Sequence, residues 1–469
     1  MLTGCKNDFD HFEDMAAAFA KSDGSINAKE LNSLKDEIKL FADDRAFKKF
    51  YINGGVDEAK VLDYLKINGY QTKFPKGTDP KKSTINVYIE NSGSMFGYVS
   101  GDTNYKDALT ELLVQLGSTY SKKQVHLFFV NTKIYPIAFD GNVAQYPGTL
   151  SPDKMKIVGD VTSSDINDIY RQILEKTPKN TVSILLSDCI YSLSGDQDTA
   201  GKLERQKSLT KDVFQDSGIT TLVAKLNSSF NGFYYPKNNI KQKLVNQARP
   251  YYISVLGSGE AVGFFYNNID FNTNFKGYEN KVVLSPETQN SDLYYTVVNT
   301  NTSSGFRPIR ELSDASSVKG IEDVEVNERN GGKFTFSIAV DMHNVPAEED
   351  VIIDAANYSV TDDYSIAISK YGEKNLKPNS IQQIAKSGAT PTHLITVTAK
   401  TAKYPDLKIA LKKQIPKWVY NTSTTDDTNI KALGSKTFGF KYLLEGISEA
   451  TESKTSSKNY FEINIKINN

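Results

Sequence analysis

Three side chains that carry oxygen atoms stand at alternate positions where a strand-like run of the sequence ends. The run "TINVYIE" ends in Glu90, and Ser92 and Ser94 follow it on one short turn. Carboxylate and hydroxyl oxygens are the ligands that hard cations such as Mg²⁺ and Mn²⁺ prefer in proteins. The turn therefore predicts a cation site. The alternative is a Ser- and Asn-rich cap of the next helix, which needs no metal.

Two more stretches carry oxygen-bearing side chains. One is the loop "VTSSDIND" (residues 161–168), which opens a helix-like segment, and the other is Ser187-Asp188 at the end of the apolar run "TVSILLSD". Functional groups gather at the carboxyl ends of strands in sheets built from alternating strands and helices. We therefore expect both stretches to converge on the turn at Glu90. The four histidines are scattered and lack the spacing of a zinc site.

The residues from 84 to 275 must position these side chains. Apolar strand-like runs alternate there with helix-like segments, and "NYKDALTELLVQLGSTY" places four leucines on one helical face. Continuous apolar strands with helices between them are typical of a parallel sheet that is covered on both faces. The pattern predicts a doubly wound, mostly parallel α/β domain.

The sequence on either side of this domain has other periods. Residues 8–75 indicate a small helical module, because "AKELNSLKDEIKLF" repeats apolar residues at helical spacing. A polar linker, "QTKFPKGTDPKKST", leads from it to the α/β domain. Residues 276–469 hold runs that alternate apolar and polar residues, such as "KFTFSIAV" and "YFEINIKIN". This alternation predicts a β-sandwich region of one or two sandwiches, with one helix at "GFKYLLEGISEA".

The helical module contains a segment that resembles a degenerate EF-hand. In the stretch around "KSDGSINAKEL", Gly24 and Glu30 match the sixth and twelfth positions of a calcium-binding loop. The first and third positions are Phe19 and Lys21, whose side chains cannot supply oxygen ligands. We therefore expect a packing module and no bound calcium.

The oxygen-bearing stretches of the α/β domain together resemble the metal-ion-dependent adhesion site (MIDAS) of von Willebrand factor A (vWA) domains, also called integrin I-like domains. That family has the motif D-x-S-x-S-M after its first strand, a threonine in a later loop and an aspartate after its fourth strand. Here the motif reads "ENSGSM", and the resemblance covers residues 84–272. It implies that Ser92 and Ser94 bind a cation through their hydroxyl groups. It also implies that Ser164 takes the threonine position, with Thr162 as the alternative.

The resemblance further implies that Asp188 is the carboxylate after the fourth strand. One departure from the motif is that Glu90 replaces the leading aspartate. Its additional methylene group moves the carboxylate outward by about 1.5 Å. Glu90 then either reaches the cation directly or prevents it from binding.

A vWA domain leaves one coordination position of its cation open, and a carboxylate of a partner fills it. The resemblance therefore implies cation-dependent adhesion to a protein or glycan, without catalysis. The loop "FGYVSGDTNY" offers Tyr98 and Tyr105 as partner contacts, unless both pack on the edge of the sheet. The rival interpretations are a metal-free scaffold with a degenerate site and, with less support, a hydrolase. A hydrolase of the nucleophile-elbow type would need the motif G-x-S-x-G, whereas this turn reads "NSGSM".

The N-terminal residues and the overall composition bear on location. Residues 2–5, "LTGC", resemble a bacterial lipobox, in which Cys5 is acylated once the signal peptide has been cleaved. The alternative is a chance tetrapeptide. The polar and acidic residues that follow resemble the surface-export tags of Bacteroidetes lipoproteins, so we expect an outer-membrane lipoprotein that is anchored only by acyl chains. The net charge of −1 argues against a general affinity for nucleic acids.

Overall fold

The structure is a computed structural model, and it describes most of the chain. The described residues are 8–20, 25–26, 28–42, 44–52, 55–68, 70–72, 83–139, 141–142, 145–162, 164–193, 198–286, 293–326, 333–342, 345, 347–401, 404–453 and 458–468. The chain divides into two compact units, one formed mainly by residues up to 79 and the other by most of the remaining chain. No helix in these described ranges is both long and apolar enough to cross a membrane.

The N-terminal unit is helical, as the sequence predicted. It contains α1 (Asp8–Ala20), α2 (Ala28–Leu40), α3 (Glu58–Ile67), the 3₁₀ turn η1 (Lys48–Phe50), and two small sheets that pair β1 (Ser25–Ile26) with β4 (Gln71–Thr72) and β2 (Tyr51–Ile52) with β3 (Gly55–Val56). Phe12, Leu34 and Phe47 are fully buried in its hydrophobic core. The apolar spacing that predicted these helices therefore corresponds to one shared core.

Two predictions concern N-terminal residues that the structure does not describe. Cys5, the predicted lipidation site, lies outside the described residues. In the EF-hand-like segment, Lys21 and Gly24 also lie outside them, whereas Glu30 lies in the first turn of α2. The expectations of acylation and of no bound calcium both stay predictions.

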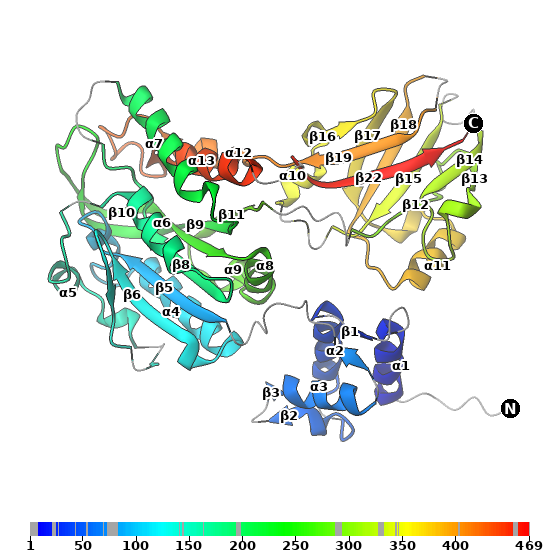
Figure 1. Cartoon of the computed structure of the whole chain (residues 1–469), viewed down its shortest axis with the longest axis horizontal. Helices are drawn as coiled ribbons and strands as arrows, with labels where there is room; N and C mark the ends of the chain where they lie inside the picture. Colours follow the sequence, from blue (N-terminus) through cyan, green and yellow to red (C-terminus); the bar gives the residue numbers. More distant parts are fainter. Residues whose placement is uncertain are drawn as a thin grey trace. The chain divides into compact units, whose positions relative to one another are not determined.

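Seven strands form the central sheet in the order β11-β9-β10-β8-β5-β6-β7 (Figure 1). Their bounds in chain order are β5 (Thr84–Glu90), β6 (Val125–Val130), β7 (Ile134–Pro136), β8 (Thr181–Ser187), β9 (Thr220–Tyr234), β10 (Gln242–Gly257) and β11 (Tyr278–Leu284). Strand β5 pairs in parallel with β6 and β8, and the other neighbouring pairs are antiparallel. The prediction of a mostly parallel sheet is therefore wrong. Short turns join β6 to β7 and β9 to β10, and such connections permit only antiparallel pairing.

Helices cover both faces of this sheet. They are α4 (Asn104–Thr119), α5 (Pro152–Lys156), α6 (Ile166–Glu175), α7 (Thr199–Gln215), α8 (Gly259–Asn268) and α9 (Phe271–Asn274), with 3₁₀ turns at η3 (Met95–Tyr98), η4 (Lys122–Gln124) and η5 (Pro147–Thr149). Successive side chains of a strand point to opposite faces. Accordingly, Val87 of β5 shares a hydrophobic core with Leu112 of α4, whereas Tyr88 shares a second core with Ile169 of α6.

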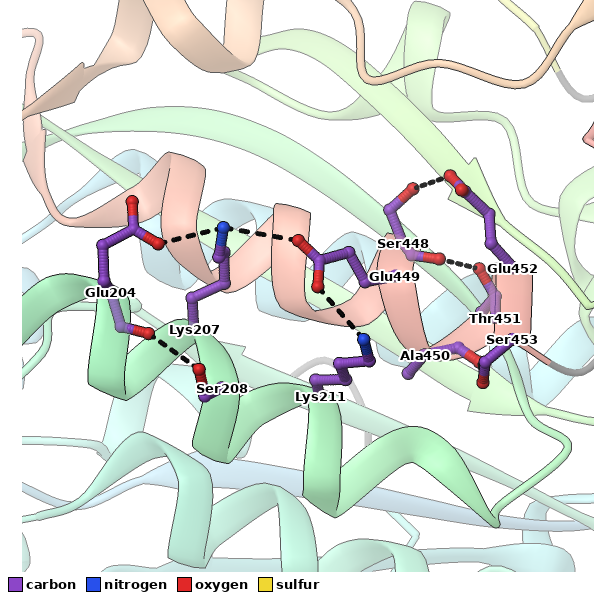
Figure 2. A network of polar contacts seen from close by, with 10 residues as sticks. All are labelled: Glu204, Lys207, Ser208, Lys211, Ser448, Glu449, Ala450, Thr451, Glu452 and Ser453. Atoms are coloured by element: carbon purple, nitrogen blue, oxygen red, sulfur yellow. Dashed lines mark hydrogen bonds and ion pairs between the residues drawn. The ribbon is translucent and has the colours of Figure 1, made fainter.

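A segment from the last part of the chain also packs on the seven-stranded sheet. It comprises α12 (Lys417–Thr422), β20 (Ser423–Thr424), β21 (Thr437–Phe438) and α13 (Phe440–Ser453). Phe440 stacks on Tyr252 of β10, with 4.0 Å between the ring centroids. Figure 2 shows α13 beside α7, where Glu449 lies 3.3 Å from the side-chain nitrogens of both Lys207 and Lys211. This segment is therefore part of the α/β structure.

The α/β part thus extends beyond the boundary that was expected at residue 275. The sequence analysis assigned β11, α12 and α13 to the β-rich region. Their apolar side chains, among them Val282, Val419 and Leu443, instead lie in the core that α6 and α7 form with the sheet. Only spatial contacts identify this grouping, because more than a hundred residues separate β11 from α12 in the sequence.

The β-rich part contains one sheet of four strands and one of five. The first has the order β12 (Tyr295–Val298), β15 (Thr335–Val340), β18 (His393–Ala399), β17 (Tyr364–Lys370), and all its pairs are antiparallel. The second has the order β13 (Gly305–Pro308), β14 (Gly320–Glu325), β22 (Asn459–Ile467), β19 (Leu407–Lys412), β16 (Tyr358–Val360), with β14 and β22 parallel and the other pairs antiparallel. Helices α10 (Glu349–Ile353) and α11 (Pro378–Ser387) and the turns η6 (Arg310–Leu312), η8 (Ala355–Asn357) and η9 (Glu373–Asn375) lie in the connections. Phe336 of the first sheet and Ile463 of the second belong to one shared core.

Candidate metal centre

The candidate site lies where β5 and β8 end. These strands pair in parallel, with Ile89 of β5 opposite Leu186 of β8. Because parallel strands end on the same edge of a sheet, Glu90 and the Ser187-Asp188 pair are brought together there. The predicted convergence of these residues is therefore present in the fold, although the sheet as a whole is not mostly parallel.

Glu90 is buried and is held by hydroxyl groups. It is 3% exposed. One carboxylate oxygen accepts a hydrogen bond of 2.7 Å from the Ser164 hydroxyl, and the other accepts one from the Ser187 hydroxyl. These contacts orient the carboxylate, and among the residues that the structure describes no basic side chain forms an ion pair with it. A buried charge of this kind is costly unless another group neutralises it.

Asp188 is the second buried carboxylate of the site. It is 3% exposed, and it accepts hydrogen bonds from the Ser94 hydroxyl and from the Ile190 main-chain N–H. Burial, and next the negative charge of Glu90, raise the pKa of Asp188 to about 7. The Arg249 guanidinium opposes this shift of the pKa without cancelling it. The site is therefore short of positive charge at neutral pH.

The two serines of the turn face each other. The Ser92 and Ser94 hydroxyl oxygens lie 3.0 Å apart. Hydrogen bonds to the neighbouring segment at α5 fix the turn, because the Asn91 side chain donates to the main-chain carbonyls of Met155 (3.0 Å) and Val158 (2.7 Å). The hydroxyl oxygens thus have a defined position beside the buried carboxylates.

The backbone after β8 is strained. Cys189 has a positive φ of 52°, which side chains other than glycine rarely adopt and which costs about 1 kcal/mol or more. Its main-chain N–H donates to the Ser187 hydroxyl at 2.8 Å, and this same hydroxyl donates to Glu90. The left-handed residue therefore turns the chain so that Ser187 and Asp188 both serve the site. Strain of this kind concentrates at functional sites.

Of the two candidates for the threonine position, Ser164 is the one that contacts Glu90. The Thr162 side chain is exposed, and its hydroxyl donates to Asp160 at 2.6 Å. Thr162 still lines the cavity beside the site. The structure therefore favours Ser164 as the hydroxyl donor of this loop.

The prediction that Tyr98 and Tyr105 contact a partner is wrong. Their exposed fractions are 1% and 0%, and both rings pack against Tyr251 of β10. Burial raises the pKa of both phenols far above the usual range. Both rings belong to the hydrophobic core of the sheet, whereas Gly101 and Asp102 of the same loop are exposed.

A cavity of about 640 Å³ opens beside the turn. It is lined by the oxygen-bearing residues Glu90, Ser92, Ser94 and Ser164. It is also lined by residues of the end of β9, of the β9–β10 connection and of the returning segment, namely Tyr234, Tyr235, Pro236, Lys237, Asn239 and Asp427. The Tyr235 ring lies 3.5 Å from the position that a Cβ atom on Gly93 would occupy. The turn and the hairpin therefore line one cavity together.

The sequence analysis did not identify the residues that the β9–β10 hairpin and Asp427 contribute to this cavity. The turn signal "YPKNN" between two strand-like runs could have identified the β9–β10 hairpin. No local signal could have identified Asp427, which comes from the segment that returns to the sheet late in the chain. Its carboxylate accepts hydrogen bonds from the Tyr234 hydroxyl (2.8 Å) and the Lys237 main-chain N–H (3.0 Å).

The donor set fits a hard cation better than a zinc ion. Within the described ranges, no three side chains of His, Cys, Asp or Glu gather at metal-binding distance. The site instead combines two buried carboxylates with serine hydroxyls, and such all-oxygen sets suit Mg²⁺ or Mn²⁺. The uncompensated charge of Glu90 and Asp188 supplies an electrostatic reason for a cation to bind.

Comparisons with known proteins add no assignment. No protein-family model matches the chain, and no curated protein or solved structure matches it either. What the fold and the site define is a mixed α/β protein with a helical N-terminal part, a seven-stranded sheet and further, mostly antiparallel sheets.

Proposed function

We propose that this chain binds a partner through a divalent cation, Mg²⁺ or Mn²⁺, held at the end of β5. The observation that carries the proposal is the pair of buried carboxylates, Glu90 and Asp188, beside serine hydroxyls at the wall of an open cavity. A bound divalent cation supplies positive charge and one open coordination position for a carboxylate of the partner. The role is adhesion or assembly and not catalysis.

Each residue has a distinct part in this proposal. Ser92 and Ser94 offer hydroxyl oxygens as direct ligands, and Asp188 offers a carboxylate that already contacts the Ser94 hydroxyl. Glu90 lies deeper, and Ser164 and Ser187 orient its carboxylate. Glu90 therefore contributes charge to the site and, because its side chain is longer than that of aspartate, reaches a cation directly or through water.

The resemblance to vWA domains supports the proposal in part. Strands β5, β6, β7 and β8 are the first four strands of this sheet along the chain. The serine motif therefore follows the first strand and Asp188 follows the fourth, as in the family pattern. The antiparallel strand β10 lies between β8 and β9, and Glu90 replaces the aspartate of the motif. We therefore propose a divergent vWA-like domain, with the two later sheets as one β-sandwich.

A metal-free scaffold is the second candidate function. One observation favours it: both oxygens of Glu90 accept hydrogen bonds from serine hydroxyls, and Asp188 accepts one from Ser94, so the network is satisfied without an ion. A scaffold of this kind would bind its partner equally well in the presence of a chelator.

Isothermal titration of the full chain with Mn²⁺ and Mg²⁺ separates these candidates. The full chain is needed because α13 and β11 complete the core of the sheet. We expect one ion to bind per chain, and we expect Asp188→Asn to abolish binding. Asp153→Asn, which alters an exposed carboxylate on α5, is the matched control and should bind the ion as the parent does. An absence of binding to the parent would leave the scaffold as the better account.

The location of the protein is a separate proposal. We propose that the chain is an outer-membrane lipoprotein that is anchored through acyl groups on Cys5, and the lipobox-like residues 2–5 support this. In that setting, the binding site would act on the surface of the cell or in the periplasm.

A further inference from the structure

The β9–β10 hairpin continues beyond the rest of the seven-stranded sheet. Strand β10 pairs with β8 over residues 252–256, and β9 pairs with β11 over residues 221–226. The hairpin itself continues from there to the pair Tyr234–Gln242. We call residues 230–247 the hairpin tip. The tip pairs with no further strand in the described part of the chain, and many of its side chains are exposed.

The hairpin tip carries exposed apolar side chains. Phe233, Tyr235, Ile240 and Val245 are 43%, 46%, 66% and 70% exposed. Large hydrophobic side chains that gather on one exposed element mark interaction sites more often than single ones do. The tip is therefore a candidate contact surface for a partner.

The tip is also basic. Lys241 and Lys243 lie exposed on it, whereas the Lys237 side chain is 14% exposed and lies 3.7 Å from Asp426. The sequence contains no acidic residue between Asp216 and Glu260. Lys241 lies over the Phe233 ring, with its nitrogen 5.0 Å from the ring centroid, so charge and apolar surface alternate along the tip. A complementary partner surface would combine carboxylates with apolar side chains.

The tip is held firmly beside the candidate metal centre. Near the turn of the hairpin, the Asp427 carboxylate accepts hydrogen bonds from the Tyr234 hydroxyl and the Lys237 main-chain N–H. The Gln242 side chain donates to the Thr428 carbonyl at 2.6 Å, and this contact adds a second tie to the same returning segment. On the opposite side, Tyr235 lies against Gly93 of the serine turn. Residues of the tip and of the turn therefore lie close together and line the same cavity.

Two glycines permit this close approach. A Cβ atom on Gly97 would lie 2.3 Å from the Phe230 ring, and one on Gly232 would lie 2.8 Å from the Gly97 Cα atom. The backbones of η3 and β9 can therefore touch just below the turn. This packing sets the distance between the hairpin tip and the oxygen-bearing residues.

We propose that the hairpin tip docks an acidic, partly apolar segment of a partner protein, one carboxylate of which enters the cavity. The inference rests on the proposed function of the serine turn, because that carboxylate completes the cation site. The flanking apolar side chains of the segment cover Tyr235, Ile240 and Val245, and its other carboxylates face the lysines. The tip would then decide which carboxylate-bearing partners the site accepts.

A protein segment fits this surface better than an anionic membrane does. Thr162, Tyr235 and Asn239 are exposed residues that line the cavity, so a carboxylate carried by a peptide that lies on the hairpin tip would enter beside them. A membrane surface would engage the apolar residues and lysines without using the cavity. The two alternatives therefore differ in whether binding depends on the serine turn.

A peptide-display selection against the full chain in Mg²⁺ tests the inference. We expect the selected peptides to combine Asp or Glu with apolar residues. Fluorescence anisotropy with the best labelled peptide should show at least about tenfold weaker binding to the variant Ile240→Ser/Val245→Ser, because both substitutions remove apolar surface that the docked segment would bury. The variant Lys241→Gln/Lys243→Gln should bind more weakly, mainly at low salt.

The controls separate failure of this inference from failure of the metal site. Ile67→Ser removes an exposed apolar side chain from α3, and Lys122→Gln/Lys123→Gln removes exposed charges from η4; both should bind the peptide as the parent does. The hairpin variants should still bind Mn²⁺ in the titration. Peptide binding that is equal in the parent and the hairpin variants would overturn the inference, as would a selection that enriches no acidic peptide. Binding of the parent to phosphatidylglycerol vesicles that the hairpin variants lose, without any peptide binding, would overturn it in favour of a membrane.

Discussion

Replacing Asp188 by asparagine is expected to make the metal-free protein more stable. The ordinary pKa of the aspartate carboxyl is 3.8, and burial together with the charge of Glu90 raises the pKa of Asp188 to about 7. Unfolded chains therefore lose this proton at a lower pH than the folded protein does. The contribution of Asp188 to the free energy of unfolding of the parent therefore falls as the pH rises from 4 to above 7, because this residue binds more protons in the folded state in that range.

The size of the effect follows from this difference in pKa. A difference of roughly three pH units at about 1.4 kcal/mol each gives an upper bound of about 4 kcal/mol above pH 7. The asparagine keeps one oxygen to accept from Ser94 or Ile190, and a lost hydrogen bond costs about 1 kcal/mol. We expect a net gain of about 2 kcal/mol at pH 8, which corresponds to roughly 4–8 °C in the melting temperature of a domain of this size.

Calorimetric melting of the full chain in EDTA at pH 4 and pH 8 measures this effect. Asp188→Asn should melt above the parent at pH 8 and close to it at pH 4. Added Mg²⁺ should raise the melting temperature of the parent and leave that of the variant unchanged. A variant that melts below the parent at pH 8 in EDTA would refute the argument that burial and Glu90 disfavour the Asp188 charge.

Three further predictions concern the packing beside the site, the buried Arg249 and the N-terminal cysteine. Gly97→Ala should lower the free energy of unfolding by about 1–3 kcal/mol in urea denaturation, because its methyl group meets the Phe230 ring; an unchanged midpoint would show that the ring moves freely. Arg249→Met should lower the free energy of unfolding by about 3 kcal/mol or more, because the buried guanidinium donates to main-chain carbonyls within residues 433–436. Amide hydrogen exchange should increase in that segment first. Equal exchange in parent and variant would contradict this role. In cells fed an alkyne fatty acid, Cys5→Ala should abolish labelling of the protein, and persistent labelling would exclude acylation at this residue.

Part of the candidate site could be predicted from local sequence. Ser92 and Ser94 follow one strand and Asp188 follows another, and strands β5 and β8 pair in parallel, so their ends had to meet. Ser164 opens the segment before α6, where hydroxyl-bearing residues are common. These positions depend on contacts that a strand-helix pattern already implies.

Other features depend on long-range contacts that the pattern does not contain. Strands β9 and β10 are continuously buried over residues 220–226 and 249–257, where helices cover both faces of the sheet, so the apolar runs in these halves resemble those of parallel strands. Tyr98 and Tyr105 follow a polar turn, and only the packing of η3 and of the start of α4 against β9 and β10 buries them. The position of Asp427 depends on a segment that joins the sheet after an intervening β-rich part.

A crystal of the full chain grown with Mn²⁺ tests the central claim most directly. The account predicts one anomalous-scattering peak at the end of β5, about 2 Å from the oxygens of Ser92 and Ser94, with Asp188 bound directly or through water. Crystals of Asp188→Asn grown under the same conditions should lack this peak. A parent crystal in which Mn²⁺ occupies only other positions, while Ser164 and Ser187 still hold Glu90 by hydrogen bonds, would contradict the account and favour a metal-free scaffold.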